Sequence, residues 1–217
     1  MPIKKHDFVE LEYTGRLKDG SEVFDTTDAK TAKEAQIFSD KTEYSPIVIC
    51  IGEHQILKGI DEFLVGKDAG KFTLELSADR AFGKKKSELV KMIPTSKFAE
   101  QGIKPVPGLR LNIDNYVGMV KTVSGGRTVV DFNHPLAGRD VVYDLKVNKI
   151  VTDKKVQVES LLRVLLGVKV PVDVKEKKAI ITFPAELPDQ LKTELSKKLT
   201  ELTSLEIAYE VKKKDSK

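Results

Sequence analysis

The segment EYTGRLKDGSEVFDTT, residues 12–27, joins the end of one strand pattern to the start of another. From residue 8 onward apolar and polar residues alternate, and the apolar ones share one strand face: Val9, Leu11 and Tyr13. Asp19-Gly20 is a turn signal, and residues 21–25 then resume an extended pattern. The segment therefore predicts a half-buried strand, a turn and a second extended stretch.

Further elements are predicted on the C-terminal side of this segment. Residues 29–46 are polar and lack a sustained period, so they are expected to form a long surface loop. Residues 46–52 (PIVICIG) predict a short buried strand, and residues 71–77 (KFTLELS) predict another. Between them, residues 55–65 predict a helix whose apolar positions fall at helical spacing: Ile56, Leu57, Ile60 and Leu64.

The chain then divides into three parts. Residues 84–135 hold their own small set of strands, at 109–115, 116–123 and 127–132, and they read as an insertion because the alternating segment 141–150 completes the first sheet. Its apolar positions share a face: Val141, Tyr143, Leu145 and Val147. The predicted domains are residues 1–83 with 136–153, residues 84–135, and residues 154–217.

The third part predicts an αββαβ order. One helix carries an apolar stripe at Val158, Leu161, Leu162 and Leu165, and a second helix carries one at Leu191, Leu195, Leu199 and Leu202. The segments 168–174 and 178–183 read as a strand pair, and residues 204–211 as a final strand. The fold class is therefore α+β.

Composition and charge exclude several classes of protein. The chain has 217 residues, a net charge of +4 and one cysteine, Cys50, which rules out an intramolecular disulfide framework. With no apolar run of signal-peptide or membrane-span length, we expect a cytoplasmic protein without a membrane partner. Residues 155–217 are balanced in charge once the tail from Lys212 is set aside, which argues against nucleic acid as a partner.

No motif for nucleotide binding, metal binding or nucleophilic catalysis is present. The three histidines, His6, His54 and His134, are scattered and lack the spacing of a metal site. His134 lies in DFNHPLAGRDVVYD, residues 131–144, where it is either a base or ligand or part of a turn. Pro135 disfavours helix at His134 and favours the turn. We expect neither a metal nor a cofactor.

Three segments taken in order resemble the FKBP-type peptidyl-prolyl cis-trans isomerases: EYTGRLKDGSEVFDTT, PIVICIGEHQILKGIDEFLVGK (46–67) and LSADRAFG (76–83). The first departs from the family pattern by one residue inserted before Phe24-Asp25. NHPLAG (133–138) resembles an element of the SlyD-like subgroup, in which a small domain is inserted in the flap, and the third part resembles the longer archaeal-type members. The histidine-rich metal-binding tail of some SlyD-like proteins is absent.

The resemblance implies an antiparallel sheet wrapped on a short helix, with a mainly-β insert and a C-terminal α+β module. It also implies an apolar pocket in which an X–Pro bond rotates. The implied catalytic residues are Tyr13, Asp25, Phe82 and Tyr143, and the implied substrate-binding residues are Phe24, Ile47, Ile56, Leu57 and Ile60. Ile56 is expected to offer its backbone N–H to a substrate carbonyl. Ordinary core packing is the alternative for the apolar members, and turn capping is the alternative for Asp25.

Two departures leave the function with an alternative. Ile60 stands where many family members have tryptophan, and Phe82 replaces a tyrosine. The main expectation is a prolyl isomerase that also acts as a chaperone through its insert, and the alternative is a non-catalytic holdase with a degenerate pocket. Both would act on unfolded or proline-containing polypeptides.

The insert is expected to grip unfolded chains through apolar residues that its small core does not need: Met92, Ile93, Phe98, Val117 and Met119. The alternative is that the insert uses all of them internally. For the C-terminal module, homodimerisation and an extra client-binding surface are the two interpretations.

Overall fold

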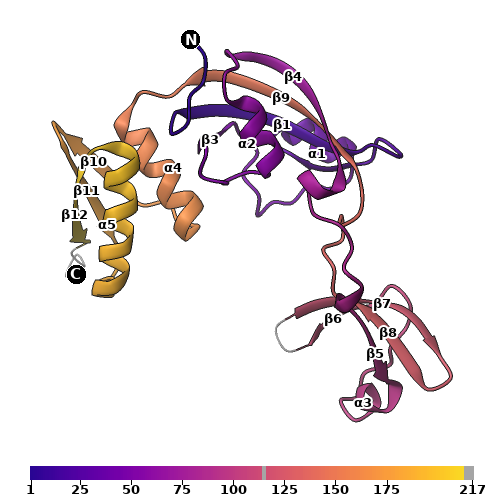
Figure 1. The fold of residues 1–217 in the computed structure, drawn as a ribbon. Coiled ribbons are helices and arrows are strands. Elements are labelled where there is room, and N and C mark those ends of the chain that lie inside the picture. The colour runs from indigo at the N-terminus through magenta and orange to yellow at the C-terminus, as the bar shows by residue number, and fades with distance from the viewer. Residues whose placement is uncertain (114–115, 213–217) are drawn as a thin grey trace. The chain divides into compact units, whose positions relative to one another are not determined.

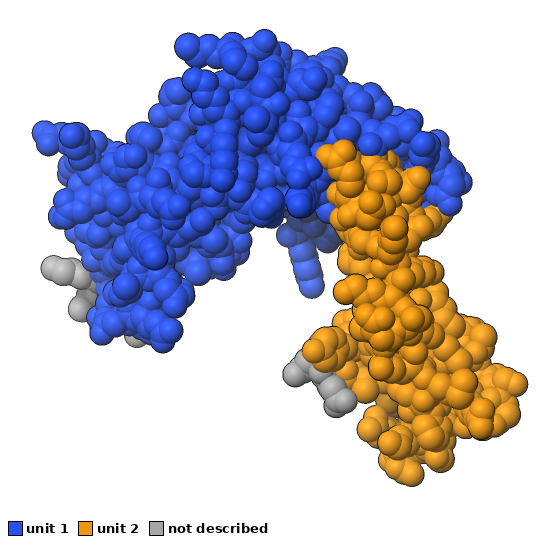
Figure 2. Space-filling model, viewed as in Figure 1, with its two compact units in different colours: residues 1–75, 142–217 blue, residues 76–141 orange. Residues whose placement is uncertain are grey.

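The computed structural model describes residues 1–113 and 116–212. They form two compact units, residues 1–75 with 142–217 and residues 76–141, which Figure 2 draws in different colours. The unit that contains residues 76–141 is wider than the predicted insert. Residues 154–217 share a unit with the predicted isomerase domain, so the expected boundary at residue 153 does not separate compact units.

A five-stranded sheet is the framework of the first unit. Its strands run in the order β2-β1-β9-β4, and β3 also pairs with β1. They are β1 (Phe8–Leu17), β2 (Val23–Thr26), β3 (Ile47–Cys50), β4 (Gly70–Leu76) and β9 (Val141–Ile150). Both β2 and β3 are antiparallel to β1, along different halves of that strand. β1 is thus the central element, and it carries the predicted Tyr13.

Two short helices of this unit differ from the sequence-based expectation. Residues 29–46 were expected to be loop throughout, but α1 (Ala29–Glu34) begins there, and Asp28 caps it by accepting a hydrogen bond from the Thr31 N–H. α2 (Lys58–Leu64) was expected to start at residue 55. The helix starts later because residues before Lys58 form a turn that is held by side chains.

The second unit contains a four-stranded antiparallel sheet in the order β5-β8-β7-β6. Its strands are β5 (Val90–Pro94), β6 (Arg110–Ile113), β7 (Tyr116–Ser124) and β8 (Arg127–Asp131). The helix α3 (Thr95–Ala99) places Phe98 in a core with Leu111, Val120 and Val130. β5 and α3 had no counterpart in the predicted set of strands. Residues 114 and 115 of the predicted strand 109–115 lie outside the described residues.

The C-terminal module consists of α4 (Lys154–Leu166), β10 (Val172–Lys175), β11 (Lys178–Phe183), α5 (Asp189–Thr203) and β12 (Glu206–Val211). Its sheet pairs β10 with β11 antiparallel and β11 with β12 parallel. Asp153 caps α4 by accepting from the Lys155 and Val156 N–H groups. Leu165 was expected in the apolar stripe of α4 but is 44% exposed, because it lies in the last turn, beyond the buried positions.

One hydrophobic core joins the module to the isomerase strands. Phe8 from β1, Cys50 from β3 and Val151 are buried together with the apolar residues of α4, α5 and the small sheet. α4 contacts β3 on one side and β10 on the other, and Figure 1 shows it leading from β9 toward the small sheet. Residues far apart in sequence therefore depend on each other for burial.

Candidate active site

Three aromatic side chains of the first unit converge at the sheet, and we call Tyr13, Phe24 and Tyr143 the aromatic cluster. The ring centroids of Tyr13 and Tyr143 are 5.9 Å apart, and those of Phe24 and Tyr143 are 5.8 Å apart in an edge-to-face arrangement. A Cβ atom added at Gly15 would lie within 3 Å of both Phe24 and Tyr143. Glycine at this strand position therefore leaves room for the two rings.

Asp25 provides the polar group of the cluster. It pairs with Gly15 across the β1–β2 ladder, so the exposed carboxylate reaches the Tyr13 hydroxyl, which donates to Asp25 Oδ2 at 2.9 Å. Burial, followed by the charge of Asp25 nearby, raises the pKa of both Tyr13 and Tyr143 above the ordinary value. Both tyrosines consequently remain uncharged phenols at neutral pH.

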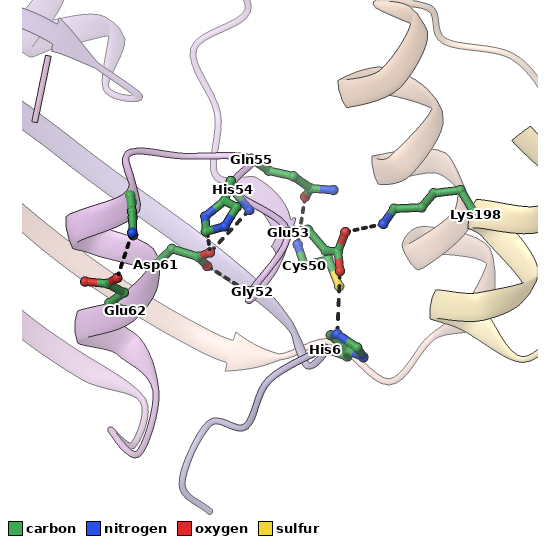
Figure 3. Close-up of polar contacts among 10 residues, drawn as sticks. His6, Cys50, Gly52, Glu53, His54, Gln55, Asp61, Glu62 and Lys198 are labelled. Carbon is green, nitrogen blue, oxygen red and sulfur yellow. Dashed lines mark hydrogen bonds and ion pairs between the residues drawn. The ribbon is translucent and has the colours of Figure 1, made fainter. Parts of the chain in front are cut away.

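The polar contacts around β3 and α2 hold a turn between them (Figure 3). The buried Asp61 carboxylate on α2 accepts from the backbone N–H of Gly52 at 2.8 Å and of His54 at 3.3 Å. The Gln55 side chain accepts from the Cys50 N–H at 2.8 Å. These bonds fix the backbone leading to residues 56 and 57, and the predicted site residues did not include Asp61 or Gln55.

The substrate-binding residues predicted around that turn have different degrees of burial. Ile56 and Leu57 are half-buried in the turn, whereas Ile60 on α2 is fully buried. Ile47 is half-buried on β3, where it pairs with Leu11 of β1.

Glu53 connects the same turn to the C-terminal module. One carboxylate oxygen lies 2.5 Å from Lys198 Nζ of α5, and the other lies 3.5 Å from His6 Nε2. Figure 3 shows Glu53 between these two partners. The carboxylate of Glu53 raises the pKa of Lys198, which keeps that ammonium charged. Sequence reasoning missed this ion pair because its members are 145 positions apart.

Phe82 belongs to the second unit, where its ring stacks on His134 with centroids 4.6 Å apart and an interplanar angle of 4°. His134 Nδ1 accepts from the Leu136 N–H at 3.2 Å, and the His134 carbonyl accepts from the Ala137 N–H at 2.9 Å. These local bonds confirm the turn interpretation of His134. In the described ranges, no three His, Cys, Asp or Glu side chains gather in a way that could hold a metal ion.

The five residues predicted as a client-binding surface divide between the two faces of the second unit's sheet. The strand registers place Met92, Val117 and Met119 on one face, with Met92 61% and Val117 65% exposed. Ile93 packs against the core on the other face, and Phe98 is a buried core residue. The prediction is thus wrong for Phe98 as a surface residue, because a sheet this small needs α3 to cover its apolar face.

Comparisons with known proteins show which families and relatives the chain is similar to. A family model described as FKBP-type peptidyl-prolyl cis-trans isomerase matches residues 1–100, and one described as FKBP26, IF domain matches residues 91–136. The chain belongs to the FKBP-type peptidyl-prolyl cis-trans isomerases. Within that family it is SlyD-like.

Several curated relatives are similar over about two thirds of the chain. A short-type peptidyl-prolyl cis-trans isomerase of Methanocaldococcus jannaschii is 28% identical over 149 residues, which are 68% of this chain and 94% of that protein. The FKBP-type 16 kDa isomerase of Escherichia coli is 26% identical, covering 68% of this chain and 93% of that protein. SlyD of Vibrio cholerae is 29% identical, covering 68% of each.

Within residues 1–113 and 116–212, none of the helices has the length and apolar character needed to cross a bilayer.

Proposed function

We propose that this isomerase rotates X–Pro bonds of polypeptide clients at the aromatic cluster. Amide resonance sets a barrier of about 18–20 kcal/mol, and no covalent bond is broken on the way over it. The site needs no nucleophile or proton relay, only a pocket that binds the twisted amide better than the planar one. The observation that carries the proposal is the convergence of the half-buried Tyr13, the buried Tyr143 and Phe24 beside the Asp25 carboxylate.

Each member of the site has a distinct task in this proposal. The rings of Phe24 and Tyr143 exclude water from the proline, and Ile60 forms the floor. The backbone N–H of Ile56 holds the substrate carbonyl, and the Asp61 bonds keep that turn in place. Asp25 orients the Tyr13 hydroxyl toward the rotating amide.

Asp25→Ala tests the polar member of the site. Because the Asp25 side chain is exposed, its loss should leave the protein folded while lowering kcat/KM for a short X–Pro peptide. The matched change is Asp28→Ala, which removes a carboxylate of similar exposure that caps α1 instead. Unchanged turnover in Asp25→Ala, measured by NMR exchange of the peptide, would remove Asp25 from the site.

Catalysis and simple holding of unfolded chains differ in their dependence on concentration. A catalyst speeds the slow, proline-limited phase of refolding when present at far less than one copy per client. A holdase suppresses aggregation only in proportion to its amount. We expect the first behaviour, and a refolding assay over a range of ratios of protein to client measures it.

We further propose that the open face of the second unit's sheet holds unfolded clients. Four apolar side chains share this face: Val90, Met92, Val117 and Met119. Flexible methionines adapt to varied partners, and apolar side chains on an open sheet face have no core to join. Binding there would raise the local concentration of client beside the isomerase site.

A double variant, Met92→Ser with Val117→Ser, tests this face. It should slow catalysed refolding of a protein client by about tenfold while leaving short-peptide isomerisation unchanged. Val106→Ser is the control, because Val106 is also exposed but lies in a loop. Equal losses with peptide and protein clients would contradict the proposal.

The C-terminal module is proposed to mediate homodimerisation. Its exposed apolar residues include Leu165, Val168 and Val211. Leu165→Glu should shift the mass measured by sedimentation equilibrium from dimer to monomer. A wild-type chain that sediments as a monomer at high concentration would refute this role.

A further inference from the structure

The strand β3 has one edge bonded to β1 and a second edge that faces away from it. Ile51, just past the strand, donates to the Asp7 carbonyl and accepts from the His6 N–H, so the backbone of Ile51 points toward β1. Backbone direction alternates along a strand, so Ile47 and Ile49 also point toward β1, while Val48 and Cys50 point away. In the described part of the chain, β3 pairs with no strand except β1.

The two outward-pointing residues differ in what meets them. The Cys50 N–H donates to the Gln55 side chain, which closes that end of the edge. Val48 instead lies on the wall of a cleft of about 750 Å³ between β3 and α4. An exposed strand edge with a free N–H and C=O is a template for another extended chain. The cleft therefore offers backbone hydrogen bonds as well as apolar contacts.

The cleft has the size and lining of a peptide site. Its walls include Pro46, Val48, Gln55, Val156, Ser160 and Val170. Its volume falls within the range of about 300–1,000 Å³ that ligand sites occupy. At one end Arg163 and Lys169 share the single carboxylate of Glu43, and the lining also includes Glu159, so these four groups together carry no net charge. The lining favours an extended, mainly apolar segment over an ionic ligand.

The cleft shares one residue with the predicted substrate-binding set, and that residue, Ile47, pairs with Leu11, two positions before Tyr13 on β1. Gln55, which also lines the cleft, directly precedes Ile56. A polypeptide whose X–Pro bond occupies the aromatic cluster would have its neighbouring residues next to the β3 edge.

We propose that this cleft binds the client residues that flank the target proline, which add to β3 as an extra strand through the N–H and C=O of Val48. The inference rests on the proposed function, and it gives that site a second part. Main-chain bonds supply affinity without reading sequence, which suits an enzyme for many clients. α4 then serves as the outer wall of a substrate groove, a role for the C-terminal module that is separate from dimerisation.

Ser160→Trp tests the cleft, because a large ring on this wall of α4 fills it without touching the aromatic cluster. We compare isomerisation of a short peptide, X–Pro with about one residue on each side, with that of a long peptide extended by apolar residues. In Ser160→Trp the KM for the long peptide should rise about tenfold, which corresponds to the loss of two backbone hydrogen bonds, while the KM for the short peptide should be unchanged. Lys154→Trp is the matched control, since Lys154 is exposed on α4 and does not line the cleft.

The outcomes separate this inference from the proposed function. Two results would refute the cleft site and leave the proposed function standing, provided that the wild type isomerises the short peptide. In the first, Ser160→Trp has the wild-type KM for both peptides. In the second, the KM for the long peptide rises as much in Lys154→Trp as in Ser160→Trp. If the wild type leaves the short peptide unaltered, the proposed function falls, and the inference falls with it.

A second measurement does not depend on any variant. Saturating wild-type protein with the long peptide should slow hydrogen exchange at the Val48 amide, because that N–H gains a partner. The Ile49 amide, already directed toward β1, should change little. Unaltered exchange at Val48 under saturation would overturn the proposal.

Discussion

Gly15→Ala places a methyl group between the two rings that the proposed site depends on. The added Cβ would lie 2.8 Å from Phe24 Cζ and 2.9 Å from Tyr143 Cε1. Carbon atoms in ordinary contact are about 3.5–4.0 Å apart, so the rings must move by about 0.7–1 Å. Such overpacking costs about 1–3 kcal/mol of unfolding free energy. A displacement of about 1 Å in a catalytic site can cost about a hundredfold in rate.

The assay for Gly15→Ala is isomerisation of a short X–Pro peptide, with urea unfolding measured on the same sample. We expect kcat/KM to fall by at least about tenfold while the protein remains folded. Gly118→Ala is the control, because its added Cβ would lie 2.6 Å from Val130 Cγ1 in the other unit, giving a comparable clash away from the aromatic cluster. Full activity in folded Gly15→Ala, or an equal loss in Gly118→Ala, would refute the placement of the site.

Three further predictions concern the join between the isomerase strands and the C-terminal module. Lys198→Met should lower the unfolding free energy by about 1 kcal/mol in a urea titration, because Glu53 loses its closest cation, and Lys198→Arg should restore most of it. Burial, followed by the charges of nearby carboxylates, raises the pKa of the Cys50 thiol to about 12. The buried, protonated thiol contributes fully to folding stability below the unfolded-state pKa of about 8.5, and this contribution is lost progressively above that pH. The unfolding free energy should therefore fall by about 2 kcal/mol more in wild type than in Cys50→Ala between about pH 8.5 and 10. Parallel pH profiles of the two proteins would contradict this. Asp153→Ala removes the cap of α4 and should cost about 1 kcal/mol, with one cooperative transition in thermal unfolding.

The strands with strict alternation could be predicted from the sequence. β1 and β9 are buried on one face and partly exposed on the other, and a period of two residues encodes that difference directly. Elements with no such period could not be found: α1 depends on the cap from Asp28, and β5 is exposed along most of its length. For α2, the helical spacing of apolar residues already begins at Ile56 and Leu57, before the true start of the helix at Lys58.

The candidate site could be located only through ordered motifs. Tyr13, Phe24 and Tyr143 are ordinary strand residues by pattern, and only the resemblance set them apart from core. Asp61 stands inside one of the quoted motifs, but its role as a buried acceptor for two backbone N–H groups depends on a turn that no pattern describes. Likewise, Met92 and Ile93 lie on opposite faces because they are consecutive residues of β5, a strand that the sequence pattern did not predict.

The single core that Phe8, Cys50 and Val151 form with the last third of the chain limits how this protein can be shortened. Removing the C-terminal module would expose the apolar side chains of Phe8, Cys50 and Val151 to water and should cause aggregation. A shortened protein would therefore need polar residues at these three positions, because the isomerase strands rely on the C-terminal module to cover them.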